Sequence, residues 1–277
     1  MTDRYAVIGN PISHTKSPLI HGTFAKATQQ DLEYTAIEGP LHPAGGFADA
    51  VRAFRDSGGR GMNITAPFKL LAFEMADEKS ERAQLAGAAN ALKFELNGRT
   101  LAENFDGIGL VNDIVRNLDT AMAGKRVLLL GAGGAVRGAL LPFLAERPAE
   151  LVLANRDAAK AAQLATRLAS RGNVRGGGYA DIGAGRFDIV VNATSASLRG
   201  ELPPLSPGAF TIDGLAYELA YGKGLTPFLR LASNAGVKRL ADGVGMLVEQ
   251  AAEAFVWWRG VRPQTRALIA QLTLPLK

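Results

Sequence analysis

A short glycine-rich segment is the first part of the chain whose residue types suggest chemistry. Gly131-Ala132-Gly133-Gly134-Ala135 directly follows an apolar run at 127–130 and precedes residues with helical spacing. Glycine at the first position permits a tight turn. Glycine at the third lets the backbone approach a pyrophosphate at a helix N-terminus, where free N–H groups attract anions. The last glycine of the strict dinucleotide pattern is replaced by Val136, so these five residues are predicted to form a variant dinucleotide-binding turn.

The end of the next apolar run indicates which dinucleotide is bound. The run at 150–154 is followed by Asn155 and Arg156. A site that prefers NAD places a carboxylate at this position for the ribose hydroxyls. The Arg156 guanidinium can pair with a 2′-phosphate through charge-assisted hydrogen bonds, which predicts NADP. Asp157 would repel that phosphate if it turned inward. We interpret it instead as an acid at the start of the next helix.

The elements that must position these residues alternate between strand and helix. Strands are expected at 125–131, 150–155, 187–192, 210–215 and 237–240, and helices at 135–146, 158–170 and 226–235. This alternation predicts a parallel, doubly wound sheet, because a crossover helix is the economical link between parallel strands. Ligands bind at the carboxyl ends of such strands, which is where Asn192, Thr194 and Ser195 lie. The glycine-containing segments 171–173 and 176–178 are expected to be exposed loop.

The remaining parts of the chain predict an α/β region and a helical tail. Strands are expected at 4–9, 32–37 and 61–65, and helices at 47–54, 244–258 and 264–272. Two further helices are expected to start at Ser17-Pro18, with Ser17 as the N-cap, and at Pro67. Asn97-Gly98 between two apolar runs predicts a hairpin.

Composition excludes several classes of protein. The 277 residues are 47% hydrophobic and carry 31 basic and 26 acidic side chains, a net charge of +5. This much apolar surface with so low a charge density excludes a disordered chain. Cysteine is absent, which excludes disulfides and thiolate chemistry and fits a cytoplasmic protein. No apolar run reaches the roughly 18 residues of a membrane span, and no signal peptide is expected.

The basic residues are dispersed, so nucleic acid is not an expected partner. The three histidines, His14, His21 and His42, have no accompanying carboxylate cluster, so no metal site is expected.

Six ordered blocks, spread over nearly the whole chain, resemble the shikimate dehydrogenase family. The blocks are Gly9-Asn10-Pro11-Ile12-Ser13-His14-Thr15-Lys16-Ser17-Pro18, Asn63-Ile64-Thr65-Ala66-Pro67-Phe68-Lys69, Gly87-Ala88-Ala89-Asn90, Asn104-Phe105-Asp106-Gly107, Asn192-Ala193-Thr194-Ser195 and Asp242-Gly243-Val244-Gly245-Met246-Leu247 with Gln250. The resemblance implies a reversible, NADPH-dependent reduction of 3-dehydroshikimate to shikimate, on the pathway to the aromatic amino acids. It implies two domains: a discontinuous α/β substrate domain, residues 1–105 plus 243–277, and an inserted Rossmann-like, doubly wound NADP domain, residues 106–242, with the site in the cleft.

Lys69 and Asp106 match the catalytic pair of the family. A hydride that reaches a ketone carbon leaves an alkoxide, and a lysine held beside a carboxylate can stabilise that charge and donate the proton. Local sequence alone would instead make Lys69 a solvated helix lysine, and Asp106 also fits a helix N-cap.

The resemblance also implies residues that bind the substrate and the nicotinamide. Thr15 and Ser17 match the two hydroxyls that bind the substrate carboxylate, although the family usually has Ser at the first position. Tyr217 matches a tyrosine near that carboxylate, and Gly243 lies where the backbone must approach the nicotinamide. Phe105 replaces a common threonine. Ligands of the ring hydroxyls are matched by Asn63, Thr65, Asn90 and Gln250.

Three alternatives remain open. A quinate/shikimate dehydrogenase would have relaxed substrate and NAD preference, and Thr15 and Asp157 are the features that favour it. A non-catalytic, ligand-sensing homologue should have lost Lys69 or Asp106, or gained a DNA-binding segment. Another two-domain dehydrogenase on the same fold is the third alternative, because fold does not fix function. The sequence is compatible with a monomer or a homodimer.

Overall fold

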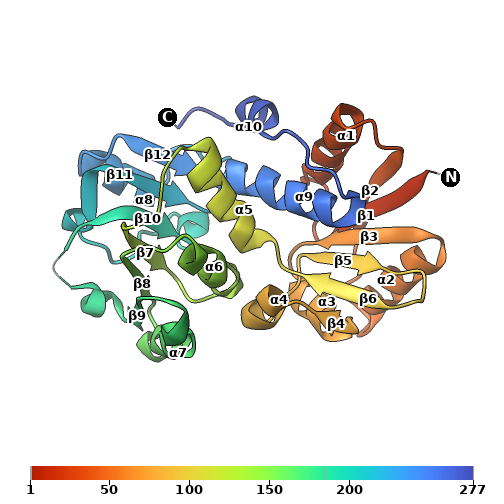
Figure 1. Ribbon diagram of the computed structural model, residues 1–277, viewed down its shortest axis with the longest axis horizontal. Helices are drawn as coiled ribbons and strands as arrows, with labels where there is room; N and C mark the ends of the chain where they lie inside the picture. The colour runs from red at the N-terminus through yellow and green to blue at the C-terminus, as the bar shows by residue number, and fades with distance from the viewer. Residues whose placement is uncertain (1, 184, 277) are drawn as a thin grey trace. The chain divides into compact units, whose positions relative to one another are not determined.

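The computed structural model describes residues 2–183 and 185–276, and the chain divides into two compact units. Unit 1 is Met1–Gly109 with Val248–Leu268, and unit 2 is Leu110–Leu247 with Ile269–Lys277. Each unit contains a six-stranded sheet (Figure 1). The chain is therefore an α/β protein of two units, as expected from the sequence.

The sheet of unit 1 has mixed strand directions. In order across the sheet, its strands are β2 (Leu32–Glu38), β1 (Asp3–Gly9), β3 (Gly59–Ile64), β5 (Ala91–Phe94), β6 (Thr100–Glu103) and β4 (Glu78–Lys79). β1 pairs in parallel with β2 and β3, whereas β5 pairs antiparallel with β3 and β6. The predicted hairpin at Asn97-Gly98 is confirmed: Gly98 has a φ of 87°, which a side chain would disfavour.

Helices α1, α2, α3 and α4 of unit 1 connect these strands. Their bounds are α1 (Ser17–Ala27), α2 (Gly46–Asp56), α3 (Lys69–Met75) and α4 (Glu81–Ala86). The prediction that Ser17 is the N-cap of α1 was wrong. The N-cap is Lys16, and the Ser17 N–H donates to the Thr15 hydroxyl at 3.3 Å. The third helix starts at Lys69, two residues after the predicted Pro67, because Thr65 to Phe68 form a turn closed by the Phe68 N–H.

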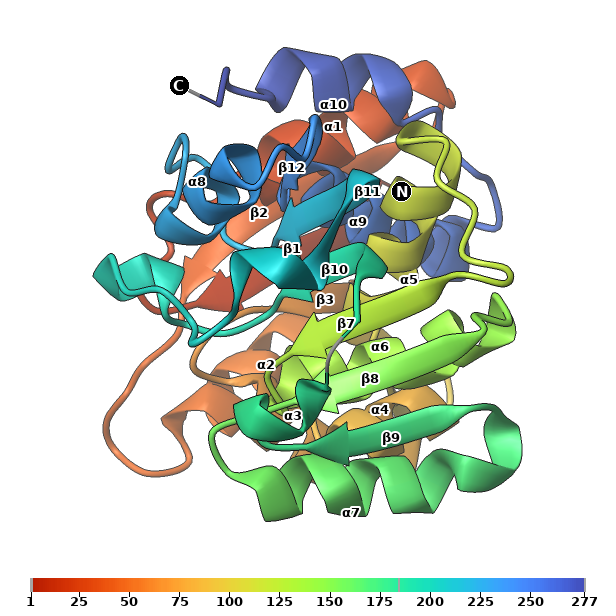
Figure 2. The same ribbon diagram turned by 90° about the vertical axis from the view of Figure 1, so that its left-hand side faces the viewer.

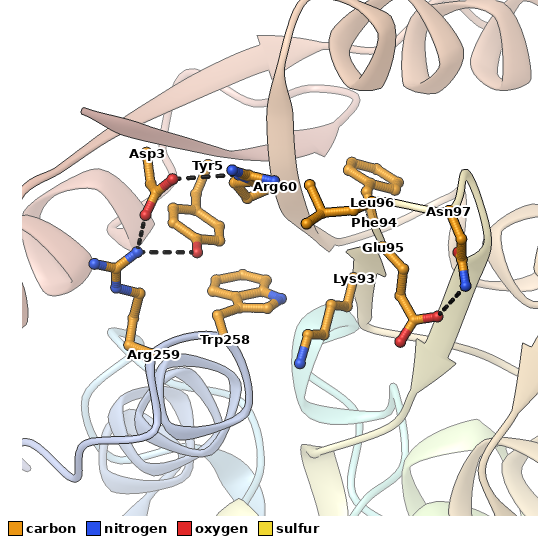
Figure 3. A pocket seen from close by; sticks show the side chains of 10 residues that line it. All are labelled: Asp3, Tyr5, Arg60, Lys93, Phe94, Glu95, Leu96, Asn97, Trp258 and Arg259. Carbon is orange, nitrogen blue, oxygen red and sulfur yellow. Dashed lines mark hydrogen bonds and ion pairs between the residues drawn. The ribbon is translucent and has the colours of Figure 1, made fainter. Parts of the chain in front are cut away.

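Helix α9 (Val244–Arg259) packs its unit 1 portion, from Val248 onward, on the sheet of unit 1. Trp258 donates to the Leu92 carbonyl at 3.1 Å and stacks on Tyr5, with ring centroids 4.8 Å apart. This close approach requires Gly61, where a Cβ would lie 2.5 Å from the indole nitrogen. A hollow of about 530 Å³ lies beside these rings (Figure 3). Asp3 in its wall accepts from both Arg60 and Arg259, and the bond to Arg259 attaches α9 to β1.

The sheet of unit 2 is parallel throughout, which confirms the doubly wound prediction. Its order is β12 (Arg239–Asp242), β11 (Phe210–Glu218), β10 (Phe187–Asn192), β7 (Arg126–Leu130), β8 (Glu150–Ala154) and β9 (Val174–Gly177). The crossover helices are α6 (Gly134–Ala145), α7 (Ala158–Leu168) and α8 (Pro227–Asn234). Figure 2 shows β7, β8 and β9 side by side.

Strand β9 corrects an expectation, because part of it was predicted to be exposed loop. It is a four-residue edge strand that pairs in parallel with β8. Its glycines depress strand propensity, but Gly176 is required by packing: a Cβ there would lie 2.2 Å from the Ala161 carbonyl oxygen on α7.

Two further helices are α5 (Asp106–Asn112), which continues into a π-helical turn at Asp113–Asn117, and α10 (Arg266–Leu272). Within the described residues, none of the helices is long and apolar enough to cross a membrane.

Candidate active site

Lys69 and Asp106 form an ion pair in unit 1. Lys69 is the first residue of α3, shortly after β3, and Asp106 is the first residue of α5, shortly after β6. The Lys69 Nζ lies 2.6 Å from the Asp106 Oδ2. The lysine side chain is 34% exposed and the aspartate side chain 11% exposed. The pairing expected across 37 residues of sequence is therefore present, and the lysine side chain keeps partial access to solvent.

Asn90 holds the carboxylate of this pair from the other side. Its Nδ2 donates to Asp106 Oδ1 at 2.8 Å and to Gln250 Oε1 at 3.0 Å. Its Oδ1 accepts from the Phe105 N–H at 2.9 Å, which fixes the orientation of the amide. The structure thus brings together Lys69, Asp106, Asn90 and Gln250, which were predicted from separate blocks of sequence.

Asn63 and Thr65 lie at and just beyond the end of β3. Asn63 is buried, and its Nδ2 donates to the Asn90 carbonyl at 3.3 Å. Thr65 lies against Gly9, where a Cβ would come within 2.2 Å of the threonine methyl group. Gly9, at the end of β1, therefore leaves the space that the Thr65 side chain occupies.

Thr15 and Ser17 lie together at the start of α1. The Thr15 hydroxyl donates to the Ser17 hydroxyl at 3.2 Å. Thr15 is partly exposed, whereas Ser17 is buried. The two hydroxyls form one polar pair, and binding of a carboxylate by this pair remains a prediction.

Tyr217 lies in unit 2 and is fully buried. Its hydroxyl donates to Asp113 Oδ2 at 2.8 Å and accepts from the Met246 N–H at 3.2 Å, in the first turn of α9. Burial, reinforced by the Asp113 charge, raises the pKa of Tyr217 well above 10, so the hydroxyl stays protonated. These bonds give Tyr217 a structural task, and its predicted contact with the substrate remains a prediction.

The glycine turn of unit 2 fits a bound pyrophosphate. Gly131 has a φ of 116°, and a Cβ there would lie 3.3 Å from the Ala193 carbonyl oxygen, so both backbone and space favour glycine. Gly133 is the N-cap of α6, and no side chain among the described residues caps that helix end. A Cβ at Gly133 or Gly134 would meet no described atom within 4 Å. Open space in front of uncapped N–H groups is the environment that a phosphate group requires.

The segment after β8 resolves the question of Asp157. Its carboxylate accepts from the Lys160 N–H at 3.1 Å and caps α7, which confirms that it serves the start of the helix. Asn155 donates to the Asp157 carbonyl at 3.0 Å, and Arg156 is exposed. The guanidinium is therefore available to a ligand while the carboxylate is occupied.

The loop after β10 rests on a buried carboxylate that the sequence did not reveal. Asn192 accepts from the Thr194 hydroxyl at 2.7 Å and donates to Glu218 at 2.9 Å. Ser197 and Thr226 also donate to Glu218, whose pKa is raised by its burial. Ser195 is exposed and accepts from Arg199 at 2.8 Å. Only the fold shows that Glu218, at the end of β11, supports this loop.

Gly243 has a packing role. A Cβ there would lie 2.1 Å from the Leu219 carbonyl oxygen, so the backbone just after β11 excludes any side chain. Its predicted approach to the nicotinamide remains a prediction.

Two residues beside Asn63 were not predicted. The Tyr34 hydroxyl donates to Asn63 Oδ1 at 2.7 Å. The His21 ring stacks on Tyr34, with centroids 4.1 Å apart and planes 5° apart. Burial lowers the pKa of His21 to about 3, and the nearby Asn63 opposes that shift only in part, so the imidazole is neutral at physiological pH.

Comparison with known proteins gives three matching family models. They are the shikimate dehydrogenase substrate binding domain over residues 7–92, shikimate / quinate 5-dehydrogenase over residues 113–199, and the shikimate 5'-dehydrogenase C-terminal domain over residues 243–273.

Similar proteins cover the full length of the chain. The shikimate dehydrogenase (NADP(+)) of Nitrosospira multiformis is 53% identical, and the match covers 98% of each chain. An Ael1 enzyme from Pseudomonas putida has a crystal structure that is 66% identical, with full coverage of both chains and a TM-score of 0.93. A shikimate dehydrogenase solved in complex with NADP+ is 27% identical, covers 99% of this chain and 96% of its own, and has a TM-score of 0.81.

Proposed function

This chain belongs to the shikimate dehydrogenase family, and from that premise we propose that it interconverts 3-dehydroshikimate and shikimate with NADPH and NADP+. The observation that carries the proposal is the Lys69–Asp106 ion pair at 2.6 Å, with Asn90 on the second carboxylate oxygen. This arrangement supplies the proton donor that reduction of a ketone requires.

In the proposed reduction, Lys69 stabilises and then protonates the substrate oxygen. NADPH, when bound, supplies the hydride to the ketone carbon. The carbonyl π electrons move onto oxygen, and the Lys69 ammonium attracts the charge that develops there and donates a proton to it. Asp106 orients the ammonium, and its own oxygens are held by Lys69 and Asn90. Because a third of the Lys69 side chain is exposed, water can return the proton.

Substrate binding is assigned to unit 1, with Tyr217 added from unit 2. The substrate has one carboxylate and several hydroxyls, so short hydroxyl and amide side chains suit it. The residues assigned are Thr15, Ser17, Asn63, Thr65, Asn90, Gln250 and Tyr217. Fixed donors and acceptors favour a polyhydroxylated ligand over an apolar one.

Cofactor binding is assigned to unit 2. The open glycine turn would hold the pyrophosphate, and Arg156 the 2′-phosphate. The residues assigned are Gly131, Ala132, Gly133, Gly134, Ala135, Asn155, Arg156, Thr194, Ser195 and Gly243. In this proposal residues 1–105 with 243–277 form the substrate domain and residues 106–242 the NADP domain, in a cytoplasmic monomer or homodimer.

The test is oxidation of shikimate and of quinate, each with NADP and with NAD, followed at the absorbance band of the reduced nicotinamide. We expect the highest kcat/KM for shikimate with NADP. A higher kcat/KM for quinate with NAD would favour a quinate/shikimate dehydrogenase. Binding of shikimate without turnover would favour a sensor and overturn the enzymatic proposal.

A further inference from the structure

Tyr34 reaches the candidate substrate site from the edge strand of the unit 1 sheet. It pairs in register with Tyr5 on β1, which pairs with Gly61 on β3. Asn63 lies two residues beyond Gly61 and therefore on the same face of the sheet. The long phenol side chain crosses β1 on that face and donates to Asn63 Oδ1 at 2.7 Å.

His21 supports the Tyr34 ring from within the core. The parallel stack at 4.1 Å leaves the phenol little freedom to tilt. The imidazole is 1% exposed, and neither ring nitrogen has a hydrogen-bond partner among the described residues. A neutral ring is required in this position, because a buried imidazolium without a partner would be strongly disfavoured. Burial also raises the pKa of Tyr34 well above 10, so its hydroxyl remains a donor.

Two fixed partners determine the orientation of the Asn63 amide. The Asn90 carbonyl can only accept, so it requires Nδ2 on its side, and Tyr34 then occupies Oδ1. An asparagine has two amide hydrogens and two acceptor lone pairs, and these two bonds use one of each. The same chain of bonds continues through Asn90 to Asp106 and Lys69.

We infer that Tyr34 is a positioning residue for the substrate, and that its hydroxyl, braced by His21, aims the Asn63 amide at a substrate hydroxyl. This inference rests on the proposed function. Tyr34 acts through Asn63 and makes no contact with the reacting atoms. Neither Tyr34 nor His21 belongs to the residues assigned above.

The test is Tyr34→Phe, which keeps the ring and its stack and removes only the hydroxyl. We expect the KM for shikimate to rise about 3- to 10-fold, the range for loss of one neutral hydrogen bond. The KM for NADP should stay unchanged. Tyr5→Phe is the matched control, because Tyr5 is another tyrosine of the same sheet and its hydroxyl bonds Arg259 instead. Its KM for shikimate should equal that of the wild type. KM does not depend on the folded fraction, so partial misfolding would not mask the result.

A double-mutant cycle with Asn63→Ala tests whether Tyr34 acts through Asn63. If it does, Tyr34→Phe has no further effect on KM in the Asn63→Ala background. An unchanged KM in the single variant, or equal effects of Tyr34→Phe in both backgrounds, would overturn the inference. Absence of shikimate turnover in the wild-type protein would instead overturn the proposed function.

Discussion

At the scale of single residues, the proposed chemistry depends on which charged groups already have partners in the protein and which are free to meet a ligand. Both oxygens of Asp106 accept hydrogen bonds, from Lys69 and from Asn90, so the carboxylate is held in place and can orient the Lys69 ammonium. Asp157 is bound to the backbone of α7, which leaves the neighbouring Arg156 as the charge that a ligand meets. This arrangement removes the main sequence argument against NADP.

Lys69→Ala tests the proton donor. We expect kcat to fall by roughly 10²- to 10⁴-fold, the usual contribution of a general acid, with a smaller change in the KM for shikimate. Lys26→Ala, on the exposed side of α1, is the control and should behave as wild type. Steady-state kinetics at saturating NADP decide the point, and a near-wild-type kcat would remove Lys69 from the mechanism.

Arg156→Ala tests the choice of cofactor. Loss of a charge-assisted contact with the 2′-phosphate should raise the KM for NADP by about 10- to 100-fold. The KM for NAD, which lacks that phosphate, should change little. Arg167→Ala, an exposed arginine in the last turn of α7, controls for net charge. Equal effects on both cofactors would contradict a 2′-phosphate site.

At the scale of elements, most residues assigned to ligands lie where strands and helices begin or end, and Gln250, inside α9, is the exception. Lys69 begins α3, Asp106 begins α5, and Asn63 is close to the end of β3. The first N–H groups and the last C=O groups of a helix have no partner within it, so capping contacts decide where the helix begins and ends. Strand β9 shows the opposite case: weak strand residues are held in a sheet because Gly176 packs against α7.

Asp157→Ala tests the cap of α7. Removal of the bond to the Lys160 N–H should lower the free energy of unfolding by about 1 kcal/mol, seen as a lower Tm by circular dichroism. Asp157→Asn retains an acceptor and should recover most of the loss. Because the carboxylate is directed to the helix, neither variant should turn the preference from NADP to NAD. A switch to NAD would show that Asp157 faces the ribose.

At the scale of the whole molecule, buried ionisable groups make stability depend on pH. His21 has a pKa of about 3 in the folded chain, against an ordinary value of 6.5. Between these values the unfolded chain binds a proton that the folded chain does not. Stability is therefore retained above pH 6.5 and lost as the pH falls toward 3, by up to about 1.4 kcal/mol per pH unit.

His21→Phe should remove this part of the acid sensitivity. Phenylalanine keeps a flat ring under Tyr34 and has no proton to bind. Urea unfolding at pH 7, 6 and 5 can be followed by tryptophan fluorescence, because both tryptophans, Trp257 and Trp258, lie in unit 1 with His21. We expect a shallower decrease in the unfolding free energy below pH 6.5 for the variant. Parallel curves would assign the acid sensitivity to other groups.

The sequence by itself determined the class of fold, the parallel sheet of unit 2, the glycine turn and the family, because these depend on local patterns: alternation, helical spacing and glycines in fixed order. It missed β9, because pairing with β8 and packing on α7 outweigh the low strand propensity of glycine. It misplaced the cap of α1, because the Thr15 hydroxyl takes the Ser17 N–H. Only the tertiary structure decided that Tyr34, His21 and Glu218 serve the candidate sites. Their partners are distant in sequence or lie on other strands, and no local pattern encodes a contact across a sheet.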